Sequence, residues 1–378
     1  MLNDEVVVQP KHRTGSIGIG RMKNAGTTVL TRINVNLEPL QVYETLLDEL
    51  ATALHRQGIR MEEGAGGRVM QGSIEVGRVV SREPGKHLKL QWQQVSWESE
   101  GHTEIEFKLE PAGGGTQLTL EYRGLDSVIH DSTDLVGWFV SQVAAPLLRT
   151  ATPDAFGDWI TDRRARRPSG AQARSVYRDP LYHYPNFRVI LKELALKPDD
   201  YLLEVACGGG ALLKSALLSG CRAAAIDHSP DMVRLASEEN REAIAAGRLE
   251  IVESNADRLP FPDAVFTCAT MTGVLGFLSN PVTVLSEMLR VLRNDGRIVI
   301  MGTDPELRGT PAAPEPMAAR LRFYNEDQLE RLGREAGFRH VTVIRRNLET
   351  FAREAGVPEE QLPLFAGAGA RFLVARKE

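Results

Sequence analysis

Strand-like and helix-like runs alternate strictly through the second half of this chain, and the alternation limits the folds available to it. Short apolar runs are each followed by a longer segment of helical periodicity. The strand-like runs are YLLEVAC, CRAAAID, LEIVESNA, AVFTCATM and GRIVIMGT, and the helical ones are ALLKSALLSG, PDMVRLASEENREAIAAG and PVTVLSEMLRVLRNDG. Such alternation predicts a parallel sheet with helices on both faces. Ligands bind these sheets beyond the carboxyl ends of the strands.

The first half of the chain has a different pattern, with a helix near each end and several strands between. VLTRINVNL predicts a strand, and EPLQVYETLLDELATAL has its apolar residues at helical spacing. Alternating runs follow, with turn signals at EPGK and PAGGG, and a second helical segment begins at DLVGWFVSQV. Because 378 residues exceed one ordinary domain, we expect two.

Composition and charge exclude several classes of protein. The net charge of −5 argues against a dedicated nucleic-acid binder, which usually presents a basic face. The basic run from Asp162 to Arg174 is interpreted as a solvated inter-domain connection. The three cysteines, at 207, 221 and 268, have no metal-ligand spacing and an odd number. With no secretory signal and no apolar run of about 20 residues, we expect a cytoplasmic protein with no membrane or metal partner.

A glycine-rich turn follows the first strand of the second half, in YLLEVACGGGALLKSA from Tyr201 to Ala216. A phosphate-binding loop needs Gly-Lys-Ser/Thr after its glycines, and Lys214 lies too far along the chain. The dinucleotide pattern G-x-G-x-x-G lacks its final glycine here. A bare backbone turn next to Glu204 suits a ligand with a cationic amino-acid end, because glycine has no Cβ to obstruct its approach.

EVACGGG resembles the acid-x-G-x-G-x-G turn of class I S-adenosylmethionine-dependent methyltransferases, with Ala206 where the first glycine is commonest. Strand two ends at Asp227, where a carboxylate can accept hydrogen bonds from ribose hydroxyls. Dinucleotide-binding folds also place an acid there, but dehydrogenases lack the later phrases NADRLPF and RVLRNDGRIVI. Over residues 181–378 these phrases together are similar to the small-molecule, UbiE-like methyltransferases.

This resemblance implies S-adenosyl-L-methionine as the cofactor and an α/β Rossmann-like class I methyltransferase domain. A helix N-cap or a loop acid is the alternative reading for Asp227 or Asp257 taken alone. The implied cofactor-binding residues are Glu204, Ala206, Cys207, Gly208, Gly210, Asp227, His228, Met232, Asn255, Ala256, Asp257, Met271 and Thr272.

GRVVSREPGKHLKLQW and LEPAGGGTQLTLEYRGL, within a strand, helix, meander and helix, resemble the START-like (SRPBCC) helix-grip superfamily. The resemblance covers about residues 25–165 and implies an α+β fold in which a curved antiparallel sheet wraps a long helix. It also implies, at most, binding of a hydrophobic small molecule. Trp92 and Trp138 are candidate substrate-binding residues, and ordinary core packing is the alternative for each.

Methyl transfer depends more on aligning the acceptor with the methyl group and on excluding water than on a dedicated base. The sequence therefore identifies the catalytic residues least well. The segment VYRDPLYHYPNF contributes His183 as a candidate general base and Tyr182 and Tyr184 as further candidates. Aromatic packing is the alternative for all three. Phe277, after the fourth strand, is a candidate substrate contact. The sequence leaves open whether oxygen, nitrogen or carbon accepts the methyl group.

The predicted organisation is a flexible tail over 1–24, a helix-grip domain over 25–165, a linker over 166–180 and a methyltransferase domain over 181–378. GSIGIG, at residues 15–20, belongs to the tail. We expect a methyltransferase for a small, hydrophobic or aromatic molecule, with the helix-grip domain assisting substrate binding or forming a homodimer. A protein or RNA methyltransferase, or a non-catalytic module that senses the cofactor, are the alternatives.

Overall fold

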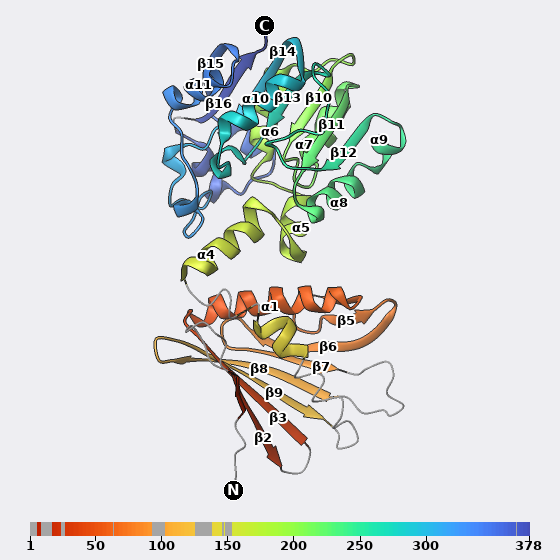
Figure 1. The fold of residues 1–378 in the computed structure, drawn as a ribbon, viewed down its shortest axis with the longest axis vertical. Coiled ribbons are helices and arrows are strands. Elements are labelled where there is room, and N and C mark those ends of the chain that lie inside the picture. Colours follow the sequence, from red (N-terminus) through yellow and green to blue (C-terminus); the bar gives the residue numbers. More distant parts are fainter. Residues whose placement is uncertain are drawn as a thin grey trace. The chain divides into compact units, whose positions relative to one another are not determined.

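The structure, a computed structural model, divides into two compact units, Met1–Trp159 and Ile160–Glu378 (Figure 1). It describes residues 6–8, 17–23, 27–62, 64–92, 103–124, 138–145, 147, 153–367 and 369–378. Over that part of the chain, none of the helices has both the length and the apolar character needed to cross a membrane.

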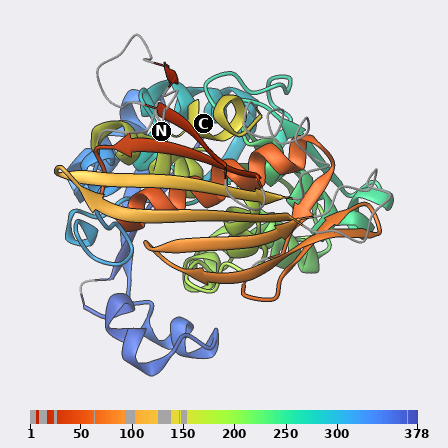
Figure 2. The ribbon, with the colours of Figure 1, turned by 90° about the horizontal axis from the view of Figure 1, so that it is seen from below.

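The N-terminal unit contains a nine-stranded antiparallel sheet in the order β1-β2-β3-β9-β8-β7-β6-β5-β4. Figure 2 shows its longer strands from their outer side. The strands are β1 (Val6–Val8), β2 (Ile17–Lys23), β3 (Thr27–Val35), β4 (Ile59–Met61), β5 (Arg68–Gln71), β6 (Ile74–Glu83), β7 (His87–Trp92), β8 (Thr103–Ala112) and β9 (Gly115–Gly124). The sheet is the meander that the alternating runs predict.

Helix α1 (Pro39–Arg56) packs its apolar face against this sheet and contacts β8 and β9. It begins with a capping box between Glu38 and Gln41, which satisfies backbone N–H groups that have no partner inside the helix. Val42, Leu46 and Leu50 recur at helical spacing and are buried. The helix and sheet together form the α+β layers expected for the first half.

The second predicted helix of this half is described only in parts. η2 (Val140–Ala144) and α4 (Pro153–Thr161) are its helical segments. Phe139 is buried against Phe107 of β8, with ring centroids 5.4 Å apart. Residues 125–137 and 148–152 lie outside the described part of the chain.

The flexible tail predicted over 1–24 is wrong for residues 17–23. This segment forms β2 and pairs with β3 along its whole length, from Ile17 opposite Ile33 to Lys23 opposite Thr27. Backbone hydrogen bonding to a neighbouring strand decides the conformation, and the glycines of GSIGIG do not prevent it.

The C-terminal unit contains a seven-stranded sheet in the order β12-β11-β10-β13-β14-β16-β15. The first five strands in that order are parallel, and β16 runs antiparallel between β14 and β15. The strands are β10 (Tyr201–Val205), β11 (Arg222–Asp227), β12 (Leu249–Glu253), β13 (Phe266–Met271), β14 (Leu292–Met301), β15 (Arg339–Arg346) and β16 (Ala370–Arg376). β10 to β14 confirm the five strands predicted from the alternation.

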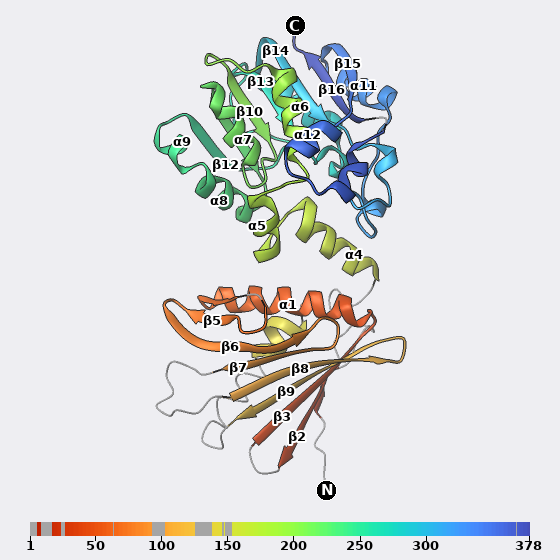
Figure 3. The ribbon, with the colours of Figure 1, turned by 180° about the vertical axis from the view of Figure 1, so that it is seen from behind.

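Helices cover both faces of this sheet, because its strands are apolar on both sides. Leu203 and Val205 pack in the cluster that includes α10 (Pro281–Val291) and α11 (Glu326–Glu335). Leu202 packs in the opposite cluster. That second cluster draws on α6 (Tyr184–Leu194), α7 (Ala211–Ala216), α8 (Pro230–Glu239) and α9 (Arg241–Ala245). Figure 3 shows α6, α7 and α12 (Glu349–Glu354) in front of the sheet.

The predicted linker over 166–180 is mostly helical and belongs to the C-terminal unit. η3 (Asp162–Arg166) and α5 (Gly170–Arg178) occupy this region, and α5 packs against α8. The guanidinium of Arg174 pairs with the Asp231 carboxylate at 2.8 Å. A basic run therefore did not mark a solvated connection here, because an acid from another helix pairs with it.

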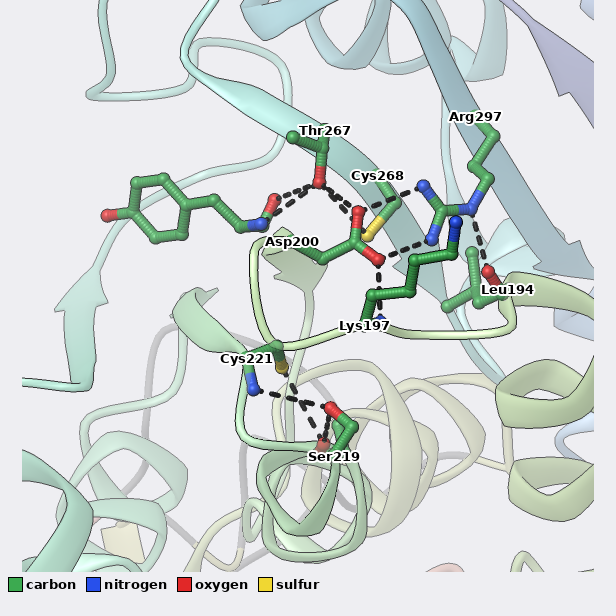
Figure 4. A network of polar contacts seen from close by, with 10 residues as sticks. Leu194, Lys197, Asp200, Ser219, Cys221, Thr267, Cys268 and Arg297 are labelled. Atoms are coloured by element: carbon green, nitrogen blue, oxygen red, sulfur yellow. Dashed lines mark hydrogen bonds and ion pairs between the residues drawn. The ribbon is translucent and has the colours of Figure 1, made fainter.

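A buried ion pair fixes the amino-terminal edge of the sheet (Figure 4). Arg297 of β14 donates to both carboxylate oxygens of Asp200, just before β10, at 3.0 and 2.7 Å. Thr267 of β13 donates to the same carboxylate at 2.6 Å. Asp200 thus joins three neighbouring strands at the edge opposite the glycine turn.

Candidate functional site

The glycine turn between β10 and α7 depends on left-handed backbone conformations. Ala206, Gly208 and Gly210 have φ values of 59°, 52° and 78°. Such values suit glycine and are unfavourable for residues with a Cβ. The position of Ala206, where related turns commonly have glycine, is therefore one of backbone strain.

Close neighbours leave no room for side chains on this turn. A Cβ on Gly208 would lie 2.9 Å from Cδ1 of Tyr177, and one on Gly209 would lie 2.2 Å from the Tyr177 carbonyl oxygen. A Cβ on Gly210 would lie 2.6 Å from Nδ2 of Asn240. The turn must consist of glycine because α5 and α8 close directly over it.

Two carboxylates lie beside the turn, at the ends of adjacent strands. Glu204 is 2% exposed and Asp227 is 5% exposed. Asp227 accepts hydrogen bonds from the backbone N–H of Gly208 at 2.9 Å and of Ser229 at 2.8 Å. Oε2 of Glu204 is buried and has no hydrogen-bond partner among the described residues. An unpartnered buried carboxylate oxygen is costly, so it marks a place for a donor from a ligand.

Burial changes the pKa values of the groups around the turn. It raises the pKa of Glu204 well above the ordinary value, and the negative charge of Asp227 raises it further. Burial also raises the pKa of Asp227, although the backbone donors partly oppose the shift. The pKa of the Cys207 thiol is raised by burial and then by both acids. Burial therefore disfavours the charged forms of these groups, most strongly those of Glu204 and Cys207.

A cavity, here called the turn cavity, lies against the glycine turn. The predicted residues on its wall are Glu204, Ala206, Cys207, Gly208, Asp227, His228 and Thr272, and the candidate base His183 joins them. Oγ1 of Thr272 is buried without a hydrogen-bond partner in the described part of the structure. The structure thus brings most of the predicted cofactor residues and one predicted catalytic residue to one cavity.

A second cavity, here called the strand-three cavity, continues from the first. The two share Ala206, Asp227 and His228. Asn255, Ala256 and Asp257, which follow β12, line it together with Phe277. The polar loop and the apolar Phe277 give it one wall that can hydrogen-bond a planar base and one that can pack against it.

Besides Gly210 and the two tryptophans, four predicted site residues lie outside the walls of both cavities. Met232 is fully buried and packs with Ala173 and Leu235, and Met271 is fully buried in the core beside α10. The hydroxyl of Tyr184 donates to Asp179 at 2.8 Å. Tyr182 is 46% exposed and donates to Gln361. Their side chains serve packing and surface contacts in this structure.

Gly210 and the two tryptophans complete the predicted set. Gly210 is the N-cap residue of α7 and contributes the end of the turn. Trp92, at the end of β7, has a buried Nε1 with no hydrogen-bond partner among the described residues. Trp138 is partly buried, and its carbonyl oxygen accepts from Ser141 at 3.1 Å. Both tryptophans belong to the N-terminal unit, and their substrate-binding role stays a prediction.

His183 lies just before α6, and its ring stacks on Phe187 with centroids 6.0 Å apart. Burial lowers its pKa below the ordinary value, so the imidazole is neutral at physiological pH. Its ring makes no side-chain hydrogen bond to the described residues. A neutral imidazole that faces a cavity can accept a proton there.

The residues that cover the turn cavity were missed by the sequence analysis. We call residues 162–180 the roof segment, and Arg166, Pro168 and Tyr177 of this segment line the cavity. The Ser229 hydroxyl donates to the Pro168 carbonyl at 2.5 Å. The N–H of Gly170 donates to Asp231 at 2.7 Å. The only available signal was Tyr177, which lies in the aromatic segment before the turn.

These observations fit S-adenosyl-L-methionine. The glycine turn lines the cavity with backbone, Glu204 offers an unpartnered carboxylate oxygen, and Asp227 lies at the end of β11. Within the described residues, no three His, Cys, Asp or Glu side chains form a metal-binding group. Two buried acids beside exposed backbone suit a ligand with an ammonium and hydroxyl groups.

The sheet order, the antiparallel β16 and the acid before the glycine turn together define a class I methyltransferase fold. Residues 203–300 match the family described as "Methyltransferase domain", and residues 36–138 match the family described as "Activator of Hsp90 ATPase homolog 1-like protein". The C-terminal unit therefore contains a methyltransferase domain with a Rossmann-like fold, and the N-terminal unit has the START-like helix-grip fold. Both predicted fold classes are confirmed.

Relatives agree with the methyltransferase match. The chain is 29% identical to the ubiquinone/menaquinone biosynthesis C-methyltransferase UbiE of Citrifermentans bemidjiense, over 30% of this chain and 50% of that protein. It is 31% identical to the uncharacterized methyltransferase C70.08c of Schizosaccharomyces pombe, over 41% of this chain and 65% of that protein. The chain spans about half the length of most curated relatives it matches.

A solved S-adenosylmethionine-dependent methyltransferase from Aquifex aeolicus is also similar. It is 21% identical, and the similarity covers 55% of this chain and 98% of that chain with a TM-score of 0.43.

Proposed function

We propose that this chain transfers the methyl group of S-adenosyl-L-methionine to a small, hydrophobic or aromatic molecule. The observation that carries the proposal is the pair Glu204 and Asp227 beside a side-chain-free turn. The bound cofactor supplies an electrophilic methyl group on a sulfonium. The protein then has to bind and orient the reactants, exclude water and, for an acceptor with an O–H or N–H, remove a proton.

Glu204 and Asp227 bind different parts of the cofactor in this proposal. The unpartnered Oε2 of Glu204 accepts from the ammonium of the amino-acid end. Asp227 accepts from the ribose hydroxyls. A carboxylate has about four lone-pair sites, and the N–H groups of Gly208 and Ser229 use two of them. Asn255 and Asp257 then hydrogen-bond the base, and Phe277 packs against it.

His183 accepts the proton of the acceptor in this proposal. It lines the same cavity as Thr272 and Gly273, at the exit of β13. A Cβ on Gly273 would lie 3.5 Å from Cε1 of His183, so the absence of a side chain there keeps the imidazole accessible. The roof segment excludes water from this region, which strengthens electrostatic contacts inside it.

The helix-grip unit assists substrate binding or dimerisation in this proposal. Trp92 supports the binding role, because its buried Nε1 is a donor without a partner. Replacement Trp92→Phe removes the donor and keeps most of the aromatic volume. We expect it to raise KM for the acceptor about tenfold and to leave cofactor affinity unchanged. An unchanged KM would argue for the dimerisation role, which sedimentation of the same variant checks.

Two measurements on the full chain test the methyltransferase proposal. Titration calorimetry with S-adenosylmethionine should detect binding that Asp227→Ala weakens by at least about tenfold. Glu253→Gln is the matched control, because Glu253 pairs with Asp227 in the register but is exposed. Absence of binding to the unsubstituted chain would overturn the proposal.

The acceptor class is tested with methyl-labelled cofactor and separated cell extracts. We expect label in the small-molecule fraction. Label in protein or RNA would overturn the choice of acceptor. Binding without label in any fraction would identify a cofactor-sensing module.

A further inference from the structure

The buried acids Glu204 and Asp227 share one face of the sheet. Glu204 pairs with Ala225 in the parallel register, and Asp227 follows Ala225 by two residues. Residues two apart on a strand point to the same face. Glu204 and Asp227 are therefore diagonal neighbours on adjacent strands, a relation that places side chains about 7–8 Å apart. Both line the turn cavity.

Burial makes two negative charges at this distance unfavourable. Both acids are more than nine-tenths buried, and neither forms an ion pair with Lys or Arg among the described residues. In a site of low dielectric constant, the repulsion between two carboxylates is relieved when the pair binds a proton or a cation. The unpartnered oxygen of Glu204 shows that backbone donors do not compensate both acids.

The other titratable and charged groups around the pair come from four elements. His183 precedes α6, Tyr177 belongs to α5, Cys207 is in the turn and His228 follows β11. Burial raises the pKa of Tyr177 and of Cys207 and lowers the pKa of His183, so all three are neutral at pH 7. His228 lowers the pKa of its neighbour Asp227.

Arg166 of η3 lines the turn cavity, and its Nε pairs with Asp162 at 2.6 Å. On the side of the strand-three cavity, Asp227 shares the wall with Arg167 and Asp257. With the Arg166 guanidinium engaged by another acid, the pair itself is the part of the turn cavity that can exchange a proton for a bound cation.

We propose that Glu204 and Asp227 together hold one proton before the cofactor binds and release it when the cationic nucleoside enters. The proposal rests on the methyltransferase function above and adds a proton-linked step to cofactor binding. The ammonium of the amino-acid end, which Glu204 binds in the proposed function, is the cation that replaces the proton. S-adenosylhomocysteine carries the same ammonium, so the demethylated product should displace the proton as well.

This exchange predicts pH-dependent binding. In the range where the pair is protonated, the affinity for S-adenosylmethionine and for S-adenosylhomocysteine should rise about tenfold per pH unit, because one proton leaves for each ammonium bound. The rise ends when both acids are ionised in the free protein.

Calorimetry measures the released proton directly. The full chain is titrated with S-adenosylmethionine and with S-adenosylhomocysteine, from about pH 5.5 to about pH 7, in two buffers of different ionisation enthalpy. This range stays below the titration of an α-amino group. We expect release of close to one proton at the low end of the range for each ligand.

Substitutions assign the proton to the pair. Glu204→Gln should abolish the release and make the affinity for both ligands independent of pH over this range, and Asp227→Asn is the second variant if the first does not fold. Glu253→Gln on the neighbouring strand should behave like the unsubstituted chain. Release that survives in both pair variants would assign the proton to a histidine and overturn the proposal.

The unsubstituted chain separates the two proposals. Binding of both ligands with no proton release would overturn the proton exchange and leave the methyltransferase function intact. No binding of either ligand would overturn the function itself.

Discussion

Ala206 has a left-handed backbone with φ of 59°, a conformation that costs a residue with a Cβ about 1–2 kcal/mol. It lies between the buried end of β10 and the glycines, and it borders both cavities. The alanine methyl therefore takes space at the site while it strains the turn that forms the site.

Replacement Ala206→Gly should relieve this strain. Glycine also increases the entropy of the unfolded chain, which offsets about 0.4–1 kcal/mol of the gain. We expect the free energy of unfolding to rise by up to about 1 kcal/mol, measured by urea denaturation. Ala245→Gly in α9 is the control and should lower it by about 0.5–1 kcal/mol. Equal losses in the two variants would contradict the strain argument.

Asp200 is the second residue whose environment allows a quantitative prediction. Replacement Asp200→Ala leaves the partly buried Arg297 guanidinium without its acid, and we expect a loss of about 2–3 kcal/mol in the free energy of unfolding. Glu354→Ala, in an exposed pair with Arg188, should cost less than about 1 kcal/mol. Similar losses for the two would show that the Asp200 pair has no special role.

The same pair has a defined pH range. Burial would raise the pKa of Asp200, but hydrogen bonds from Arg297 and Thr267 outweigh it and lower the pKa to about 2. Because the pKa in the folded state is below that in the unfolded state, the stabilisation is complete above about pH 4 and is lost as the pH falls towards 2. The stability difference between the unsubstituted chain and Asp200→Ala should shrink over that range.

The sequence predicted which segments reach the site better than it predicted which of their side chains face it. Glu204 and Asp227 were predicted from their places at strand ends, where parallel strands direct side chains to one edge. Met232 and Met271 were included with the same phrases, but both side chains turn into the core. Strand and helix direction decide this, and a single sequence shows which segment lies at the site more clearly than which side chain faces it.

At the scale of elements, the roof segment and α8 form one connected unit over the glycine turn. Asp231 of α8 accepts from the N–H of Gly170 at 2.7 Å and from Arg174 at 2.8 Å. Ser229, the N-cap residue of α8, donates a hydrogen bond to the carbonyl oxygen of Pro168. The cover of the turn cavity therefore depends on a few polar contacts to one acid and one hydroxyl.

Replacement Asp231→Ala should loosen the roof segment. Loss of a charged acceptor with two donors costs about 1–3 kcal/mol, so we expect trypsin to cleave at the arginines of residues 162–174 about tenfold faster or more. Asp231→Asn keeps an acceptor for Gly170 and should give an intermediate rate. A cleavage rate unchanged by Asp231→Ala would show that packing alone holds the roof.

The roof segment also shows why elements near the site escaped prediction. Its basic residues follow no amphipathic pattern, which favoured the interpretation as a linker. The contacts that order it come from Ser229 and Asp231, about 60 positions away, and a local pattern contains no information on them. The strands of the sheet were predicted correctly because their apolar runs are local signals.

At the scale of the molecule, the chain has two compact units with a sheet in each. The described residues on the wall of the turn cavity belong to the C-terminal unit. We expect two calorimetric unfolding transitions, of which S-adenosylmethionine shifts one, by about 2.7 kcal/mol at a concentration of 100 times Kd. A cofactor-induced shift of both transitions would contradict separate unfolding.

The order of layers was predictable for the whole molecule, and the boundaries were not. Period-two and helical patterns distinguish the two halves, but the boundary between the two units, at Trp159 and Ile160, lies inside α4. Because the helix is continuous there, the amino-acid composition does not change at the boundary and gives no signal of it.

The short strand β10 has an acid immediately before it and another one residue from its end. Asp200 is held by a guanidinium, while Glu204 has an oxygen without a donor. The same kind of carboxyl group thus stabilises the fold at one end of the strand and is available to a ligand at the other. A survey of variants along Asp200–Val205 would separate the two roles by phenotype. Substitutions of Asp200 would lower the yield of folded protein, and substitutions of Glu204 would leave the yield unchanged and abolish ligand binding.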